Sequence, residues 1–236
     1  MDNRRVIDLS HPVEHRMTTY PGLPGPEIGD HLSREQSRRN YAPGVEFQIG
    51  WIRLVANTGT YLDTPFHRYG GGTDLAGIDL TRIADVEGVL VDATDGDGDG
   101  DGDRAIAPSA FAGRPLTGRA VLVRTGWDRH WRTGMYAAPE HPFLTAETVS
   151  FLVGQGPALV GIDSVNIDDI ADLARPAHSG LLAAGIPIVE HLTGLDQLPA
   201  DGFRFHAVPA PVAGMGSFPV RAYAVAAVLL SESRWL

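Results

Sequence analysis

The sequence has no cysteine and no lysine among its 236 residues, and each absence removes a class of chemistry. Without cysteine there is no disulfide, no thiolate nucleophile and no cysteine-based zinc site. Without lysine there is no Schiff-base mechanism, because all 19 basic residues are arginine. No apolar run reaches the length of a membrane span, and the first residues lack the apolar core of a signal peptide. We therefore expect a cytoplasmic protein.

Acidic residues outnumber basic ones by 29 to 19, which gives a formal net charge of −10. This charge disfavours nucleic acid or an anionic membrane as a partner. With 43% hydrophobic residues, the chain can build one sizeable core, so one domain over residues 1–236 is expected. Alternating Asp and Gly at 95–103 suggests a calcium loop, but the twelfth position from Asp95 is Ile106 rather than glutamate. Dense like charge on a glycine-rich backbone instead predicts a flexible insertion.

Short apolar runs predict several strands and a helix. Residues 120–124 and 158–163 are typical of buried strands, and Thr145 opens a helical pattern between them, which predicts parallel pairing. Residues 52–55 also suggest a buried strand, and the alternation of apolar and polar residues over 47–51 suggests a half-buried one. Residues 30–44 are polar and are expected to be exposed. In the C-terminal part, 203–212 and 220–230 are expected to be extended.

The segment from Asn57 to His67 contains the first candidates for chemistry. Turn-forming residues occupy 57–60, and Asp63 and His67 follow, four positions apart around Pro65. Pro65 fixes its own φ and pushes Thr64 towards an extended conformation, so the segment cannot be one helix. An acid and an imidazole held on a stiff segment at a strand end suit a functional site.

A second pair of candidates lies in the C-terminal half. Pro176 begins a short helix that contains His178 and that Gly185 can close, and the strand that returns from it ends in Glu190. Such a helix rises about 9 Å and such a strand runs about 13 Å, so His178 and Glu190 can meet at one end of the sheet. Taken singly, Glu190 or His67 has an ordinary explanation as a surface charge or a loop histidine.

Other polar residues receive structural interpretations. Asp163 either orients a site group or caps the turn that follows it, and the cap is favoured. A serine triad has little support, because the sequence contains no G-x-S-x-G. The remaining histidines are expected to be surface or structural residues: His11, His15, His31, His130, His141, His191 and His206.

Residues 57–67 resemble the signature H-x-G-T-H-x-D-x-P-x-H of the metal-dependent cyclase superfamily, which includes bacterial kynurenine formamidase and isatin hydrolase. Five signature residues match, but Asn57 and Tyr61 stand where the family has two metal-binding histidines. Further similar blocks occur in the family's order: Asp8-Leu9-Ser10, Tyr20-Pro21-Gly22, Thr125-Gly126-Trp127, Gly161-Ile162-Asp163, and His178 with Glu190.

The resemblance implies an α/β fold with a mixed, curved, barrel-like β-sheet core and flanking helices, of the swivelling β/β/α kind. It also implies one divalent metal ion, manganese or zinc, on Asp63, His178 and Glu190. A two-metal site is not expected, because losing two imidazoles weakens the first position. No organic cofactor is expected. The resemblance further implies a homodimer or homotetramer.

Four more residues are candidates for the site, two of them, His67 and Tyr20, through the resemblance. His67 corresponds to the family's catalytic histidine and would shuttle a proton. Tyr61 could hydrogen-bond a developing oxyanion. Asn57 is a weak ligand or a substrate contact, and Tyr20 is a substrate contact.

Three functions remain open at this point. The leading one is an arylformamidase-like hydrolase in which metal-activated water attacks a small formamide, amide, lactam or ester. The second is a metal-free acid–base enzyme that catalyses a cyclisation, dehydration or isomerisation. The third is a ligand-binding protein without turnover. Dependence on metal separates the first from the second, and turnover lost in His67→Ala excludes the third.

Overall fold

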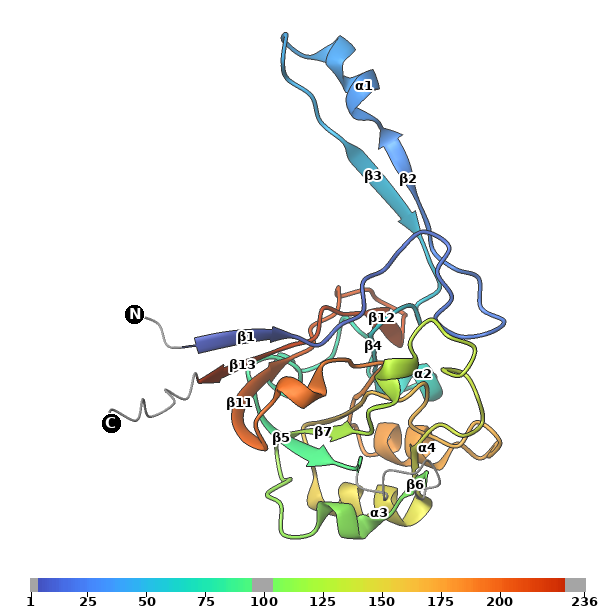
Figure 1. Ribbon diagram of the computed structural model, residues 1–236, viewed down its shortest axis with the longest axis vertical. Helices are drawn as coiled ribbons and strands as arrows, with labels where there is room; N and C mark the ends of the chain where they lie inside the picture. The colour runs from blue at the N-terminus through green and yellow to red at the C-terminus, as the bar shows by residue number, and fades with distance from the viewer. Residues whose placement is uncertain (1–3, 95–103, 228–236) are drawn as a thin grey trace, which may run out of the picture.

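The computed structural model describes residues 4–94 and 104–227 (Figure 1). The Asp/Gly segment 95–103 lies outside the described residues. The largest element is a nine-stranded sheet in the order β1-β13-β11-β5-β7-β9-β10-β4-β12. Its strands are β1 (Arg4–Asp8), β4 (Tyr61–Asp63), β5 (Val86–Asp92), β7 (Ala120–Arg124), β9 (Leu159–Ile162), β10 (Ile188–Glu190), β11 (Asp201–His206), β12 (Ser217–Pro219) and β13 (Tyr223–Ala227).

The sheet is mixed, with a parallel centre and antiparallel edges. Strands β5, β7, β9 and β10 run parallel, and Val121 lies opposite Val160, which confirms the pairing predicted from the strand–helix–strand pattern. These central strands are apolar because helices and loops cover both of their faces. Figure 1 shows the sheet curling towards its β1–β13 edge. The predicted α/β class with a curved, mixed sheet is confirmed.

The main helices cover one face of the sheet. They are α2 (Pro65–Arg68), α3 (Ala146–Gln155) and α4 (Pro176–Ala183), and α3 and α4 pack on each other below the sheet (Figure 1). Helix α3 begins where predicted, because the Thr145 side chain accepts the Thr148 N–H. Short 3₁₀ helices complete the body: η2 (Leu80–Arg82), η3 (Pro108–Phe111), η4 (Trp127–His130) and η5 (Leu195–Gln197). A small sheet joins β6 (Ala105–Ile106) to β8 (Phe143–Leu144).

A narrow arm projects from the body (Figure 1). It consists of β2 (Glu27–Leu32), α1 (Arg34–Ser37), η1 (Arg38–Asn40) and β3 (Ile49–Arg53). The predicted exposure of residues 30–44 is confirmed for most of this segment. The predictions of a buried strand at 52–55 and a half-buried one at 47–51 are wrong, because Ile52 is 52% and Phe47 53% exposed. These side chains are exposed because β3 pairs, among the described strands, only with β2 and packs neither face on the body.

No helix in the described ranges is both long and apolar enough to cross a membrane.

Candidate functional site

The pairing of β4 places two predicted site residues on one face of the sheet. Tyr61 lies opposite Glu190 of β10, and Asp63 lies two residues further on, so their side chains point the same way. The Tyr61 hydroxyl donates to Glu190 Oε2 at 2.5 Å. After β4, Thr64 is extended and Pro65 occupies the first turn of α2, which confirms that the segment is not one helix. Helix α2 then presents His67.

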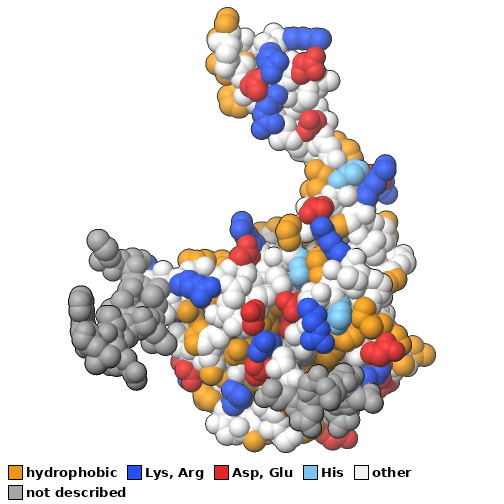
Figure 2. Space-filling model, viewed as in Figure 1, with side chains coloured by type: hydrophobic (Ala, Val, Ile, Leu, Met, Phe, Trp, Pro, Cys, Tyr) orange, Lys and Arg blue, Asp and Glu red, His pale blue; other side chains and the backbone are white. Residues whose placement is uncertain are grey.

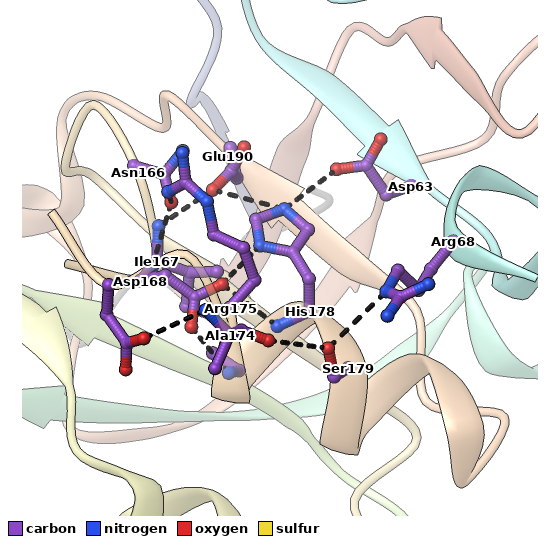
Figure 3. A network of polar contacts seen from close by, with 12 residues as sticks. Asp63, Arg68, Asn166, Ile167, Asp168, Ala174, Arg175, His178, Ser179 and Glu190 are labelled. Atoms are coloured by element: carbon purple, nitrogen blue, oxygen red, sulfur yellow. Dashed lines mark hydrogen bonds and ion pairs between the residues drawn. The ribbon is translucent and has the colours of Figure 1, made fainter. Parts of the chain in front are cut away.

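Helix α4 brings His178 to the same place, as the spacing predicted. His178 Nε2 lies 3.8 Å from Glu190 Oε1 and 3.8 Å from Asp63 Oδ2. Figure 3 shows the imidazole ring between these two carboxylates. Three residues from β4, α4 and β10, far apart in the sequence, therefore meet around one small volume.

Asp168, which was not predicted from the sequence, fixes the orientation of His178. The fully buried Asp168 carboxylate accepts the His178 Nδ1–H at 2.6 Å and the backbone N–H groups of Ala177 and His178. The ring can then present only Nε2 to the site. An acid shortly before Pro176 is a possible helix-capping signal, but nothing in the sequence ties it to an imidazole.

Ser217 is the second residue that the sequence analysis missed. Its hydroxyl donates to Asp63 Oδ1 and lies 2.8 Å from His67 Nδ1. Because serine has a single hydroxyl hydrogen, His67 must supply the proton in its own bond to Ser217. Neutral His67 therefore carries its proton on Nδ1, which leaves Nε2 as a free base.

Burial and the neighbouring carboxylates shift the pKa values of the site residues. Burial raises the pKa of Tyr61 well above 10, and the charges of Glu190 and Asp63 add to this, so Tyr61 is a neutral donor. Burial also raises the pKa of Glu190, against the opposing charge of His178. Burial would lower the pKa of His178, but the surrounding carboxylates outweigh it and raise the pKa well above 6.5.

The donor set fits a divalent metal ion. Asp63 Oδ2 is buried and has no hydrogen-bond partner among the described residues. Ligand atoms of Asp63, His67 and His178 lie within 4.8 Å of one another. Glu190 is not a member of this tight group, and its oxygens accept from Tyr61 and from the Ile167 N–H. Oxygen and imidazole donors of this kind suit manganese or zinc. A neutral, engaged Tyr61 is a weak metal ligand.

The cavity above these groups has a volume of about 260 Å³. Six predicted site residues line it: Tyr20, Asn57, Tyr61, His67, His178 and Glu190. Four residues that were not predicted also line it: Leu23, Arg68, Asn166 and Arg175. The predicted Asp63 lies deeper and does not line the cavity. The structure thus brings the sequence-predicted site residues together at one place.

Asp163 has a structural role. Its carboxylate accepts from the backbone N–H groups of Thr125 and Gly126 and from the Thr125 hydroxyl, while burial raises its pKa to about 7. It thus caps the turn that follows β7, whereas the sequence analysis favoured a cap on the turn after Asp163 itself. His191 is fully buried, and its Nδ1 lies 2.8 Å from the Tyr136 hydroxyl. This agrees with the structural role expected for His191.

Comparisons with known proteins agree with this architecture. The family model of the putative cyclases matches residues 7–169. A kynurenine formamidase of Polaromonas naphthalenivorans is 26% identical over 218 residues, which are 92% of this chain and 89% of that protein. A kynurenine formamidase of Bacillus cereus is 27% identical over 230 residues, covering 94% of this chain and 98% of that protein.

Solved structures of isatin hydrolases share the fold. Isatin hydrolase A from Labrenzia aggregata superposes with a TM-score of 0.81 at 24% identity, over 95% of this chain and 94% of that one. Isatin hydrolase A from Ralstonia solanacearum gives 0.77 at 22% identity, over 95% and 92%. At these identities the likeness concerns the fold alone. Because the family model spans more than half of the sequence, the chain belongs to the putative cyclase family.

Proposed function

We propose that the protein is an arylformamidase-like hydrolase that cleaves the C–N bond of a small aryl formamide, amide or lactam, or the C–O bond of a related ester. The observation that carries this proposal is the unpartnered Asp63 Oδ2, which faces His178 Nε2 inside a buried ring of carboxylates. The kynurenine formamidases to which the chain is similar support the same class of reaction.

Asp63, His178 and Glu190 would hold a single divalent ion, manganese or zinc, with His67 beside them. Each Glu190 oxygen accepts one hydrogen bond and keeps a second lone pair for the ion. A bound ion of this kind supplies a water molecule of lowered pKa and polarises a carbonyl oxygen. Asp168 holds the His178 ring so that Nε2 faces the ion position. Three protein ligands with an open position are typical of catalytic rather than structural metal sites.

The proton transfers fall to His67. Its free Nε2 would take the proton of the attacking water and return it to the leaving nitrogen, while Ser217 holds the proton on Nδ1. The Tyr61 proton is engaged with Glu190, so Tyr61 would reach a developing oxyanion only by leaving that bond. Tyr20 and Asn57 line the cavity and would contact the substrate.

Hydrolysis of formanilide by protein loaded with manganese or zinc tests the proposal. Removal of the metal with EDTA should abolish turnover, and Asp63→Ala and His67→Ala should each lower kcat/KM by at least about a hundredfold. His31→Ala, which alters an exposed histidine of the arm, should leave kcat/KM unchanged. Full turnover in EDTA and in Asp63→Ala would refute the metal-dependent reaction.

A metal-free acid–base enzyme is the second candidate, and the Tyr61–Glu190 bond favours it. A neutral phenol that donates to a buried carboxylate is a ready acid–base pair. This candidate predicts turnover of a cyclisation or dehydration substrate that survives complete removal of metal. A protein that only binds ligands would show no turnover in either case.

We also propose that the chain assembles with a second copy of itself through the arm. The arm exposes seven large hydrophobic side chains on two strands and their connection: Ile28, Tyr41, Val45, Phe47, Ile49, Trp51 and Ile52. Figure 2 shows hydrophobic side chains among charges of both signs over the arm. A two-stranded ribbon alone is marginally stable in water, so an apolar partner surface would stabilise it. Mixed charges favour a partner with the same mixture, which a second copy supplies.

A further inference from the structure

Two arginines, Arg68 and Arg175, line the cavity around His178, and neither has a carboxylate partner. Over residues 4–94 and 104–227, no acidic oxygen lies within 4.0 Å of either guanidinium group. Arg68 Nε donates to Ser179 Oγ and Arg175 Nη1 to Asn166 Oδ1, each at 3.4 Å. Both contacts are long and involve neutral acceptors. Figure 3 shows the two side chains on either side of the His178 ring.

Other arginines of the protein do find carboxylates. Within the described ranges, seven of them form ion pairs at 2.5 to 2.9 Å: Arg38, Arg104, Arg119, Arg124, Arg132, Arg204 and Arg221. With 29 acidic residues against 19 arginines, the chain has no shortage of partners. Arg68 and Arg175 line the cavity without a carboxylate partner among the described residues, so their guanidinium groups are available to an anion that enters it.

The backbone fixes both arginines in place. Arg175 has φ 50° and ψ 60°, a left-handed conformation that is uncommon for residues other than glycine. Its N–H donates to the Asp172 carbonyl, and its own carbonyl accepts the Ser179 N–H at 2.8 Å. Arg68 follows His67 on α2, and the Tyr69 hydroxyl ties this helix to the Ser179 carbonyl of α4. The backbone of both arginines is thus held relative to His67 and His178.

We propose that Arg68 and Arg175 bind a carboxylate of the substrate, so that this site prefers small aryl formamides or lactams that carry a carboxylate group. The inference rests on the proposed hydrolase function and adds the charge of its substrate. A guanidinium matches the geometry of a carboxylate with two parallel hydrogen bonds. The cavity volume of about 260 Å³ lies just under the usual range for ligand clefts, about 300–1,000 Å³, which suits a small substrate.

A substrate carboxylate also fits the charges of the site better than a phosphate. Glu190 lines the cavity and the buried Asp63 lies 3.8 Å from His178, so both carboxylates would repel a dianion more strongly than a single negative charge. Anchored by its carboxylate at the two arginines, the substrate would direct its formamide or lactam group towards His67 and His178. Binding energy from the remote carboxylate would then position the reacting group.

A matched pair of substrates tests the proposal: 2-formamidobenzoate, which carries the carboxylate, and formanilide, which lacks it. The ratio of their kcat/KM values should favour the carboxylate in the native protein. It should fall about tenfold in Arg68→Gln and in Arg175→Gln, and further in the double variant, because a charge-assisted hydrogen bond is lost each time. Arg175→Lys, which keeps the charge without the planar fork, should recover part of the ratio. An unchanged ratio in the double variant would overturn the proposal.

Arg82→Gln is the matched control, because Arg82 lies half-buried on η2 and does not line the cavity. It removes the same charge from the molecule, so its ratio should equal that of the native protein. A ratio that falls equally in Arg82→Gln would mean that overall charge, not the two arginines, sets the preference, and would overturn the proposal.

Calorimetric binding of benzoate and benzamide separates this inference from the proposed function. If formanilide is hydrolysed but the carboxylate brings no advantage, the inference fails and the hydrolase stands. If neither formamide is hydrolysed, the proposed function fails for these substrates, and binding decides the inference. Tighter binding of benzoate than of benzamide, lost in the Arg68→Gln/Arg175→Gln variant, would support it. Equal binding, or a preference that survives in that variant, would overturn it.

Discussion

Asp168 determines what His178 can do, although it lies outside the cavity. Its carboxylate takes the Nδ1 proton of the ring, and its two backbone contacts fix it to the start of α4. We predict that Asp168→Asn lowers the affinity for the divalent ion about ten- to a hundredfold, because the amide no longer provides an anionic acceptor for the imidazole. Titration of the metal-free protein with manganese or zinc against a chelator measures this.

Asp169→Asn provides the control for Asp168→Asn. Asp169 is the neighbouring residue and pairs with Arg104 rather than with a site group. Its variant should bind the ion as tightly as the native protein. If Asp168→Asn binds the ion with native affinity, the orienting role of Asp168 is wrong.

Residues that can act as acids, bases or metal ligands could be predicted from the sequence, whereas the residues that contact them and hold them in place could not. His178 and Glu190 could be paired because a short helix and a short strand separate them, and the structure places them 3.8 Å apart. Ser217 could not be found, because its contact with His67 spans 150 residues. Arg68 and Arg175 also escaped notice, since an arginine without a partner looks in sequence like any surface arginine.

At the scale of elements, one glycine sets the position of α2. A Cβ added to Gly216 would lie 2.2 Å from the His67 nitrogen and 2.4 Å from its Cα, and the Gly216 carbonyl accepts the Thr64 N–H at 2.7 Å. Backbone atoms cannot yield as a flexible side chain does, so Gly216→Ala must displace the start of α2. We predict a fall in kcat/KM of at least about tenfold, because a shift of about 1 Å at a catalytic group is costly.

The matched control for Gly216→Ala is Gly70→Ala. Gly70 follows α2, and a Cβ there meets nothing within 4 Å. Its variant should retain native kcat/KM on the same substrate, while thermal unfolding confirms that both variants are folded. Native turnover in Gly216→Ala would show that α2 tolerates the displacement and that His67 is not held as tightly as its contacts indicate.

Elements were predictable where one physical signal dominated. The apolar runs of β7 and β9 and the threonine cap of α3 gave the parallel centre of the sheet, because buried parallel strands need continuous apolar sequence. The burial of the arm was predicted wrongly, since alternation in β3 predicts a strand with two different faces but not what covers them. β12 has only three residues, too few for a periodic pattern, and yet it supplies Ser217.

At the scale of the whole molecule, His11 makes the free energy of unfolding depend on pH. Its ring stacks on Trp131 at 4.0 Å, and burial lowers its pKa to about 4 although Asp128 opposes this. An unfolded histidine titrates near 6.5, so between pH 6.5 and 4 the unfolded chain binds a proton that the folded protein does not. This contribution to stability is therefore complete above pH 6.5 and is lost as the pH falls through that range.

Replacing His11 by phenylalanine should remove this dependence and keep a ring against Trp131. Between pH 7 and pH 5, the native protein should lose about 1–2 kcal/mol more unfolding free energy than His11→Phe does. Urea unfolding at the two pH values measures the difference. His31→Phe, on the exposed arm, should behave like the native protein. Equal losses in the native protein and His11→Phe would assign the acid sensitivity to other groups.

The arm offers the test of assembly. Ile49 and Trp51 lie two residues apart on β3, so their side chains share one face of the ribbon, and they are 50% and 45% exposed. If that face packs on a second copy, introducing two like charges there is costly because they would be buried without partners. We predict that light scattering gives at least twice the mass of one chain for the native protein, and the mass of one chain for Ile49→Glu/Trp51→Glu.

Arg39→Glu, which changes charge on η1 but no apolar surface, should keep the native mass. A native protein with the mass of one chain, or a charged variant that stays assembled, would place the partner of this arm elsewhere.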